Sequence, residues 1–157
     1  MIQDPVTNRI EPIRKSITVA VPRERAFAVF TRRMDAWWPF AGHSMFQEKS
    51  RGVAFDPRVG GLVEEIDLDG NRAAWGRLLA WDPPASFRMT WHPGREESSA
   101  QELEVRFIEV PEGTRVELEH RGWENLRERG AEARGGYDQG WGSVLDAYVA
   151  ACADGVQ

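Results

Sequence analysis

The stretch GWGSVLDAYVAACA, residues 140–153, decides the fold of this chain. Its large apolar side chains recur at spacings of three and four residues, which is the period of one face of an α-helix. The side chains of this face are Trp141, Val144, Leu145, Tyr148, Val149 and Cys152. The pattern predicts a helix over residues 138–153, about 24 Å long, with Asp138 as its N-cap. A helix with one apolar face must bury that face against another element.

The residues before this helix show the period of β-strands. Charged side chains alternate with Leu103, Val105 and Phe107, and Asp69-Gly70 is a strong hairpin signal. The segments between turns that we predict as strands include residues 73–81, 87–92, 101–110 and 114–121. Alternation of this kind is typical of an antiparallel sheet with one buried face, and that face is the expected partner of the helix.

The N-terminal third predicts an arm, a strand and two short helices. Residues 1–12 contain two prolines and no clear period, so we expect an extended arm. Residues 13–21 predict the first strand, and the proline that follows suits the first turn of a short helix. A second short helix is expected over residues 35–38, and residues 40–52 are expected to form a loop.

Together these elements predict one α+β domain over residues 13–157. Its curved antiparallel sheet of six or seven strands would wrap around the long C-terminal helix, with two short helices after the first strand. This arrangement is the helix-grip architecture. A twisted sheet wrapped on a helix leaves a gap wherever the facing side chains do not interdigitate.

The composition limits the classes of function. The net charge of −5 argues against a general nucleic-acid binder, which needs a basic face. The longest apolar run, residues 147–153, is far shorter than the roughly 20 residues that span a bilayer. No export signal is recognisable, and the single cysteine, Cys152, fits a reducing cytoplasm. Seven tryptophans and seven phenylalanines are many for 157 residues and suit either a core or an apolar pocket.

Several short motifs, in this order, resemble a known superfamily. They are Trp37-Trp38-Pro39-Phe40 with His43-Ser44, residues 55–61 with Glu65, Trp75-Gly76, residues 113–116 leading to His120, and Gly140-Trp141. Over about residues 13–153 the chain resembles the SRPBCC (START-like) superfamily, in the branch named for the activator of heat-shock protein 90 ATPase. That superfamily includes lipid carriers, hormone receptors, aromatic-ring cyclases and co-chaperones, so the resemblance implies a fold more firmly than a function.

The resemblance implies a hydrophobic cavity between the sheet and the C-terminal helix. The candidate ligand-binding residues that it gives are Trp38, His43, Glu65, Trp75, Trp91, His120, Trp141 and Tyr148. Tyr148 is expected in the middle of the cavity. His43 falls in a glycine-containing loop, where a histidine is ordinarily exposed to solvent.

The position of the inward carboxylate has two interpretations. The apolar residues Leu62, Ile66 and Leu68 have the parity that places Glu64 on the inward face, whereas the resemblance gives Glu65. A β-bulge near Gly60-Gly61 would shift the register and reconcile the two.

Glu65 and His120 are the candidate catalytic residues, because a buried carboxyl and a buried histidine both titrate closer to neutral pH. The structural alternative is that Glu65 pairs with Arg77 and that His120 bonds to a backbone carbonyl. The histidines share no metal-ligand spacing, and no motif for a cofactor or phosphate group is present, so neither a metal nor a cofactor is expected.

Three functions remain open at this point. The first is a protein that holds an apolar or aromatic small molecule between sheet and helix. The second is a cyclase or dehydrase that moves a proton on such a molecule. The third is a protein-interaction module similar to the co-chaperone, for which no partner surface is recognisable; a chaperone partner is disfavoured, and a weak homodimer is allowed.

Overall fold

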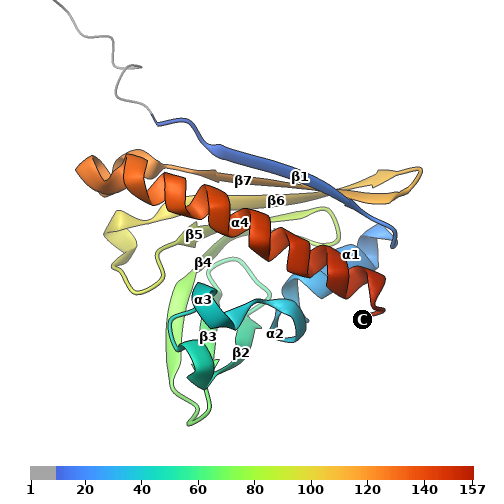
Figure 1. Ribbon diagram of the computed structural model, residues 1–157, viewed down its shortest axis with the longest axis horizontal. Helices are drawn as coiled ribbons and strands as arrows, with labels where there is room; N and C mark the ends of the chain where they lie inside the picture. Colours follow the sequence, from blue (N-terminus) through green and yellow to red (C-terminus); the bar gives the residue numbers. More distant parts are fainter. Residues whose placement is uncertain (1–9) are drawn as a thin grey trace, which may run out of the picture.

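The computed structural model of the protein describes residues 10–157 (Figure 1). Its seven strands form one antiparallel sheet in the order β1-β7-β6-β5-β4-β3-β2. The strands are β1 (Ile13–Val19), β2 (Ser50–Phe55), β3 (Leu62–Asp67), β4 (Arg72–Asp82), β5 (Ser86–Trp91), β6 (Gln101–Val110) and β7 (Gly113–Arg121). Residues 1–9 of the expected arm lie outside the described range, and residues 10–12 have no regular secondary structure.

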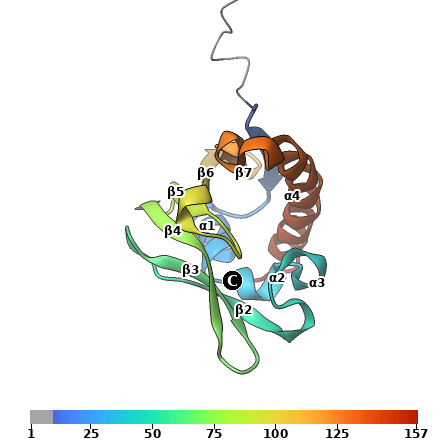
Figure 2. The same cartoon turned by 90° about the vertical axis from the view of Figure 1, so that its left-hand side faces the viewer.

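Within residues 10–157, four α-helices accompany the sheet, namely α1 (Arg23–Thr31), α2 (Met34–Trp37), α3 (Phe40–His43) and α4 (Gly130–Ala153). Figure 2 shows that the sheet curls from β7 through β4 to β2 and that α4 lies along its open side. The helix-grip prediction is therefore confirmed. Pro22 is the N-cap of α1, as its fixed φ and missing N–H favour.

Two predicted boundaries are wrong. Helix α4 begins at Gly130 rather than at residue 138, and the expected cap, Asp138, lies inside the helix and pairs with Lys15 of β1 at 3.0 Å. Glycines are weak helix formers, but tertiary packing overrides this preference of about 1 kcal/mol each. The expected loop over residues 40–52 contains α3, a 3₁₀ turn (Gln47–Lys49) and the first residues of β2.

The apolar face of α4 is buried, as its spacing predicted. Tyr148 is fully buried, and its ring lies 5.0 Å from that of Phe30 in α1 and 5.2 Å from that of Trp37 in α2. Its hydroxyl donates a hydrogen bond of 2.7 Å to the carbonyl of Ala26, and burial raises its pKa. One side chain therefore ties α4 to both short helices.

Ion pairs cover the solvent face of the sheet. Arg121 of β7 lies 3.2 Å from Glu102 and 3.1 Å from Glu104, both on the adjacent strand β6, and it also pairs with Glu119. Partial burial of Glu102 opposes its ionisation, but Arg88 and Arg121 outweigh this effect and lower its pKa. Cross-strand pairs of this kind satisfy the polar positions that alternate with buried ones.

Replacing Tyr148 by Phe should weaken the contact between α4 and α1. The variant keeps the ring but loses the hydrogen bond to Ala26, so we expect the free energy of unfolding to fall by about 1 kcal/mol in urea denaturation. Tyr137→Phe is the control, because the Tyr137 hydroxyl bonds to no other group within residues 10–157; its change should stay below about 0.5 kcal/mol. Equal changes in the free energy of unfolding in the two variants would show that the hydrogen bond from Tyr148 to Ala26 does not stabilise the contact between α4 and α1.

Candidate functional site

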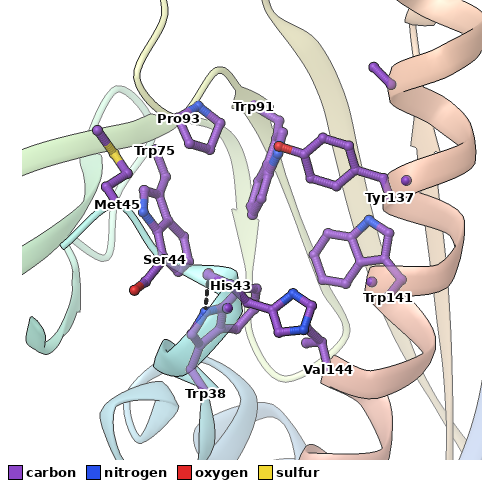
Figure 3. A pocket seen from close by; sticks show the side chains of 14 residues that line it. Trp38, His43, Ser44, Met45, Trp75, Trp91, Pro93, Tyr137, Trp141 and Val144 are labelled. Atoms are coloured by element: carbon purple, nitrogen blue, oxygen red, sulfur yellow. Dashed lines mark hydrogen bonds between the residues drawn. The ribbon is translucent and has the colours of Figure 1, made fainter. Parts of the chain in front are cut away.

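A pocket of about 440 Å³ lies between α4, the segment that follows α2, and the strands β4 and β5 (Figure 3). The side chains and backbone that line it are Trp38, Gly42, His43, Ser44, Met45, Trp75, Trp91, Pro93, Ala133, Gly136, Tyr137, Gly140, Trp141 and Val144. Five of the eight sequence-predicted residues are among them, namely Trp38, His43, Trp75, Trp91 and Trp141. Glu65, His120 and Tyr148 lie outside the lining.

Four tryptophans form a closed cycle around this pocket, which we call the tryptophan ring. Trp38 follows α2, Trp75 is on β4, Trp91 ends β5, and Trp141 is on α4. The centroids of successive side chains in that order are 4.8, 5.5 and 5.4 Å apart, and Trp141 closes the cycle on Trp38 at 5.9 Å. Each indole is almost fully buried. Residues from four separate elements therefore converge on one aromatic wall.

Three indole N–H groups of the tryptophan ring have protein acceptors. Trp38 donates to the carbonyl of His43 at 2.8 Å, and Trp75 donates to Oε1 of Glu65 at 3.0 Å. Trp141 donates to Nδ1 of His120 at 2.9 Å. The two residues expected to be catalytic thus hold the indoles in position from behind the pocket wall. The N–H of Trp91 is buried and has no partner within residues 10–157.

Glu65, and not Glu64, faces the interior. Its Oε1 also accepts from the backbone N–H of Met45 at 2.8 Å, and its Oε2 accepts from that of Phe46 at 2.9 Å. Val63 pairs with Gly76 but Glu64 pairs with Ala74, so Trp75 is the extra residue of a β-bulge on β4. Along β3 itself, Val63 and Glu65 are fully buried whereas Leu62 and Glu64 are only half-buried, so the parity argument for Glu64 fails.

The neighbouring side chains agree with this register. Glu64 points outward and pairs with Arg72 at 3.3 Å, and Leu68 is exposed. Arg77, the alternative partner that the sequence suggested for Glu65, instead lies 3.5 Å from Glu97. Glu65 is therefore held by N–H donors and not by an arginine.

His120 is fully buried behind Trp141. Because its Nδ1 accepts a hydrogen bond, the proton of the neutral ring is on Nε2, which has no partner within residues 10–157. Burial, with a smaller contribution from the charge of Arg95, lowers its pKa to about 3. His120 is thus neutral near pH 7, and the expectation that burial brings its pKa closer to neutral pH is wrong. The sequence left open that the His120 ring bonds to a backbone carbonyl. Instead, its Nδ1 accepts a hydrogen bond from the indole N–H of Trp141.

Sequence reasoning missed the first turns of α4. Ala133, Gly136 and Tyr137 line the pocket, but they precede the predicted start of the helix at residue 138. The signal was present, since Ala133, Tyr137 and Trp141 follow one another at intervals of four residues. Tyr148, expected in mid-cavity, lies two turns further along in the packed core.

A curved antiparallel sheet that grips a long C-terminal helix, with an aromatic pocket between them, defines a helix-grip protein of the START-like class. Within that class, the chain belongs to the family described as Activator of Hsp90 ATPase homolog 1-like protein, whose sequence pattern it matches over residues 20–152. The family suggested by the sequence motifs is thereby confirmed.

Solved structures extend the comparison. The chain is 38% identical to an anthrahydroquino-γ-pyrone synthase, Txn09, complexed with SUM; the match covers 80% of this chain and 85% of that one, with a TM-score of 0.57. Protein MLL2253 from Mesorhizobium loti is 17% identical over 94% of this chain and 99% of its own, with a TM-score of 0.69. The Aha1 dimer from Colwellia psychrerythraea is 15% identical over 94% and 100%, with a TM-score of 0.67. The last two show the fold alone.

Other comparisons are negative. No curated protein matches the sequence. Within residues 10–157, no helix is long and apolar enough to cross a bilayer, and no three His, Cys, Asp or Glu side chains are grouped as metal ligands.

Glu65→Gln should loosen the segment that carries His43. The amide would place a donor where the carboxylate accepts from an N–H, so one hydrogen bond of the cluster must break. We expect a loss of about 1–3 kcal/mol in unfolding free energy and faster hydrogen exchange at Met45 and Phe46. Glu64→Gln, which disturbs only an ion pair at the surface, should cost less than about 1 kcal/mol. Unchanged hydrogen exchange at Met45 and Phe46 in Glu65→Gln would show that Glu65 does not hold this segment in place.

His120 should make stability depend on pH below about 6.5. The unfolded chain binds a proton at this histidine near its ordinary pKa of 6.5, whereas the folded chain does so only near 3. The contribution of His120 to the free energy of unfolding is therefore fully present above pH 6.5. Below that pH it decreases by at most about 1.4 kcal/mol per pH unit.

His120→Gln tests this, because glutamine can accept from Trp141 but does not titrate. We expect unfolding free energy to change less steeply with pH in the variant between about pH 6.5 and 5. Carboxyls with lowered pKa values, such as those of Glu102 and Glu119, contribute mainly below that window. Equal slopes in the two proteins would show that His120 is not held neutral.

Proposed function

We propose that this protein binds a planar, polycyclic aromatic small molecule in the pocket bounded by the tryptophan ring. The observation that carries the proposal is the shape and chemistry of the wall. Four indoles and the phenol ring of Tyr137 present aromatic surfaces, and few polar side chains interrupt them. Aromatic rings stack on such surfaces at centroid distances of about 4.5–7 Å. The volume of about 440 Å³ falls within the range of small-molecule sites.

The wall formed by α4 favours a flat ligand over a branched one. A Cβ atom added at Gly136 would meet no atom within 4 Å, so the helix presents bare backbone to open space there. Gly140 lies one turn further on and also lines the pocket. A ring system can therefore approach the helix axis closely on one side and contact indoles on the other.

The relative with 38% identity supports a ligand of related chemistry. An anthrahydroquinone is planar and carries phenol groups, which matches an aromatic wall with a few polar side chains at its edge. We therefore propose that the ligand is a hydroxylated, fused-ring aromatic compound. The same identity favours one further candidate function, which is a ring-closing enzyme acting on such a compound.

A co-chaperone role finds less support in this structure. The exposed large apolar side chains within residues 10–157 are Met45, Val59, Leu68 and Leu79. Met45 lines the pocket itself, and Val59, Leu68 and Leu79 come from two connecting segments and strand β4. The pocket is therefore the better-supported site.

Binding can be measured by tryptophan fluorescence and isothermal titration calorimetry. We expect 1,8-dihydroxyanthraquinone to bind saturably and to quench the indoles, and dodecanoic acid to bind at least about tenfold more weakly. The physical reason is that a flexible chain loses more conformational entropy than a rigid ring system in the same space. Equal affinity for the two probes, or binding of neither, would contradict the proposal.

Gly136→Leu should block this site without harming the fold. The new side chain would project into the pocket, so we expect affinity for 1,8-dihydroxyanthraquinone to fall at least about tenfold. Helix stability should rise by roughly 0.5–1 kcal/mol, because glycine is a poor helix former. Gly135→Leu is the matched control: its Cβ also meets nothing within 4 Å, but Gly135 does not line the pocket, so it should share the gain in stability and keep its affinity.

A further inference from the structure

We infer that His43 is the acid–base group of this pocket and that it accepts the proton of a phenol on the bound ligand. The inference rests on the proposed function, because it requires a hydroxylated aromatic compound in the pocket. It goes further in naming the reacting side chain and the ligand atom that it contacts. Neither of the two residues that the sequence marked for catalysis, Glu65 and His120, lines this space.

The backbone around His43 is fixed on both sides. Its own carbonyl accepts from Trp38, and the two N–H groups that follow Ser44 donate to Glu65. The hydroxyl of Ser44 donates to the carbonyl of Phe40 at 2.6 Å. The imidazole itself, however, makes no hydrogen bond within residues 10–157. The backbone that carries the ring is therefore fixed, and the ring nitrogens are left available to a ligand.

The helix opposite leaves room for this imidazole. Figure 3 shows the ring pointing from its segment toward α4, close to Trp141 and Val144. A Cβ atom at Gly140 would lie 3.6 Å from Cε1 and 3.7 Å from Nδ1 of His43. Because Gly140 has no side chain, the ring can rest against the helix backbone with one edge turned to the pocket.

Few titratable groups compete with His43 for this role. Tyr137 is the only other titratable side chain among the residues that line the pocket. On the segment side, both oxygens of Glu65 are occupied by N–H donors; on the helix side, Asp138 is paired with Lys15 and His120 lies behind Trp141. Histidine is the side chain whose proton exchange is best matched to neutral pH.

Proton transfer from the phenol to His43, and the ring closure that can follow it, need neither an oxidant nor a cofactor. The phenol O–H bond breaks and its proton moves to the free imidazole nitrogen, leaving a phenoxide beside an imidazolium. In a ligand that also carries a nearby ketone, the phenoxide oxygen forms a C–O bond to the carbonyl carbon as the C=O π bond breaks and its electron pair moves to the carbonyl oxygen. The carbonyl oxygen then takes the proton back from His43, which gives a cyclic hemiketal and a neutral imidazole. Loss of water from the hemiketal would complete an oxygen heterocycle.

The test uses 2-hydroxyanthraquinone, whose phenol and phenoxide forms differ in visible absorbance, and 9,10-anthraquinone, which has no phenol. In the wild-type protein we expect the apparent pKa of the bound phenol to lie about one unit or more below its value in His43→Ala and His43→Gln. Titration of each variant with 9,10-anthraquinone measures how far the substitution changes the pocket itself, apart from any effect on the phenol proton. Added imidazole should restore the phenoxide band in His43→Ala, because the free base can occupy the space that the substitution leaves.

Measurements with the two quinones distinguish failure of the proposed function from failure of the proposed role of His43. If neither quinone binds to the wild-type protein, the proposed function fails. If both bind but the phenol absorbance is the same in wild type and in the two variants, the pocket stands and the role of His43 is wrong.

Discussion

The closed contact of four indoles is the interaction on which the rest of this structure depends. Trp141 brings α4 against Trp91 of the sheet and against Trp38, so the helix, the short helices and the strands share one aromatic centre. Buried indole N–H groups need acceptors, and this need explains the polar groups in an otherwise apolar interior. Glu65 and His120 meet it from behind the wall. Their burial is therefore a consequence of the tryptophans and does not by itself indicate catalysis.

The sequence was a good guide wherever one element carries its own pattern. The three- and four-residue spacing from Trp141 to Cys152 predicted the buried face of α4, and two-residue alternation predicted strands β6 and β7. It misled at β3, where the apolar residues used to assign parity do not mark the inward face. Val63 and Glu65 are fully buried on one face of β3, whereas Leu68 lies beyond the end of the strand and is exposed. Here the motif resemblance was the better guide, because it places the carboxylate without relying on the parity of the apolar residues.

The start of α4 was missed for a related reason. Glycines at 135 and 136 predict a turn from local preference, but packing of the helix against the sheet and the 3₁₀ turn Trp123–Arg129 outweighs that preference. The consequence for the site is large, since these turns supply a whole wall of the pocket. Physical prediction from a single chain thus locates the aromatic residues but not the empty space between them. That space depends on where side chains are absent.

The anchoring of the segment around His43 has a consequence for how such a site can change over time. Every bond that fixes it to Trp38 and Glu65 uses a backbone atom, either the carbonyl of residue 43 or the N–H groups of residues 45 and 46. Backbone atoms are the same whatever side chain is present. The side chains at positions 43 and 45 can therefore be exchanged without dismantling the support beneath them. A scaffold of this kind can pass between a carrier and an enzyme by one substitution, and descendants of a common ancestor can diverge in ligand while their architecture persists.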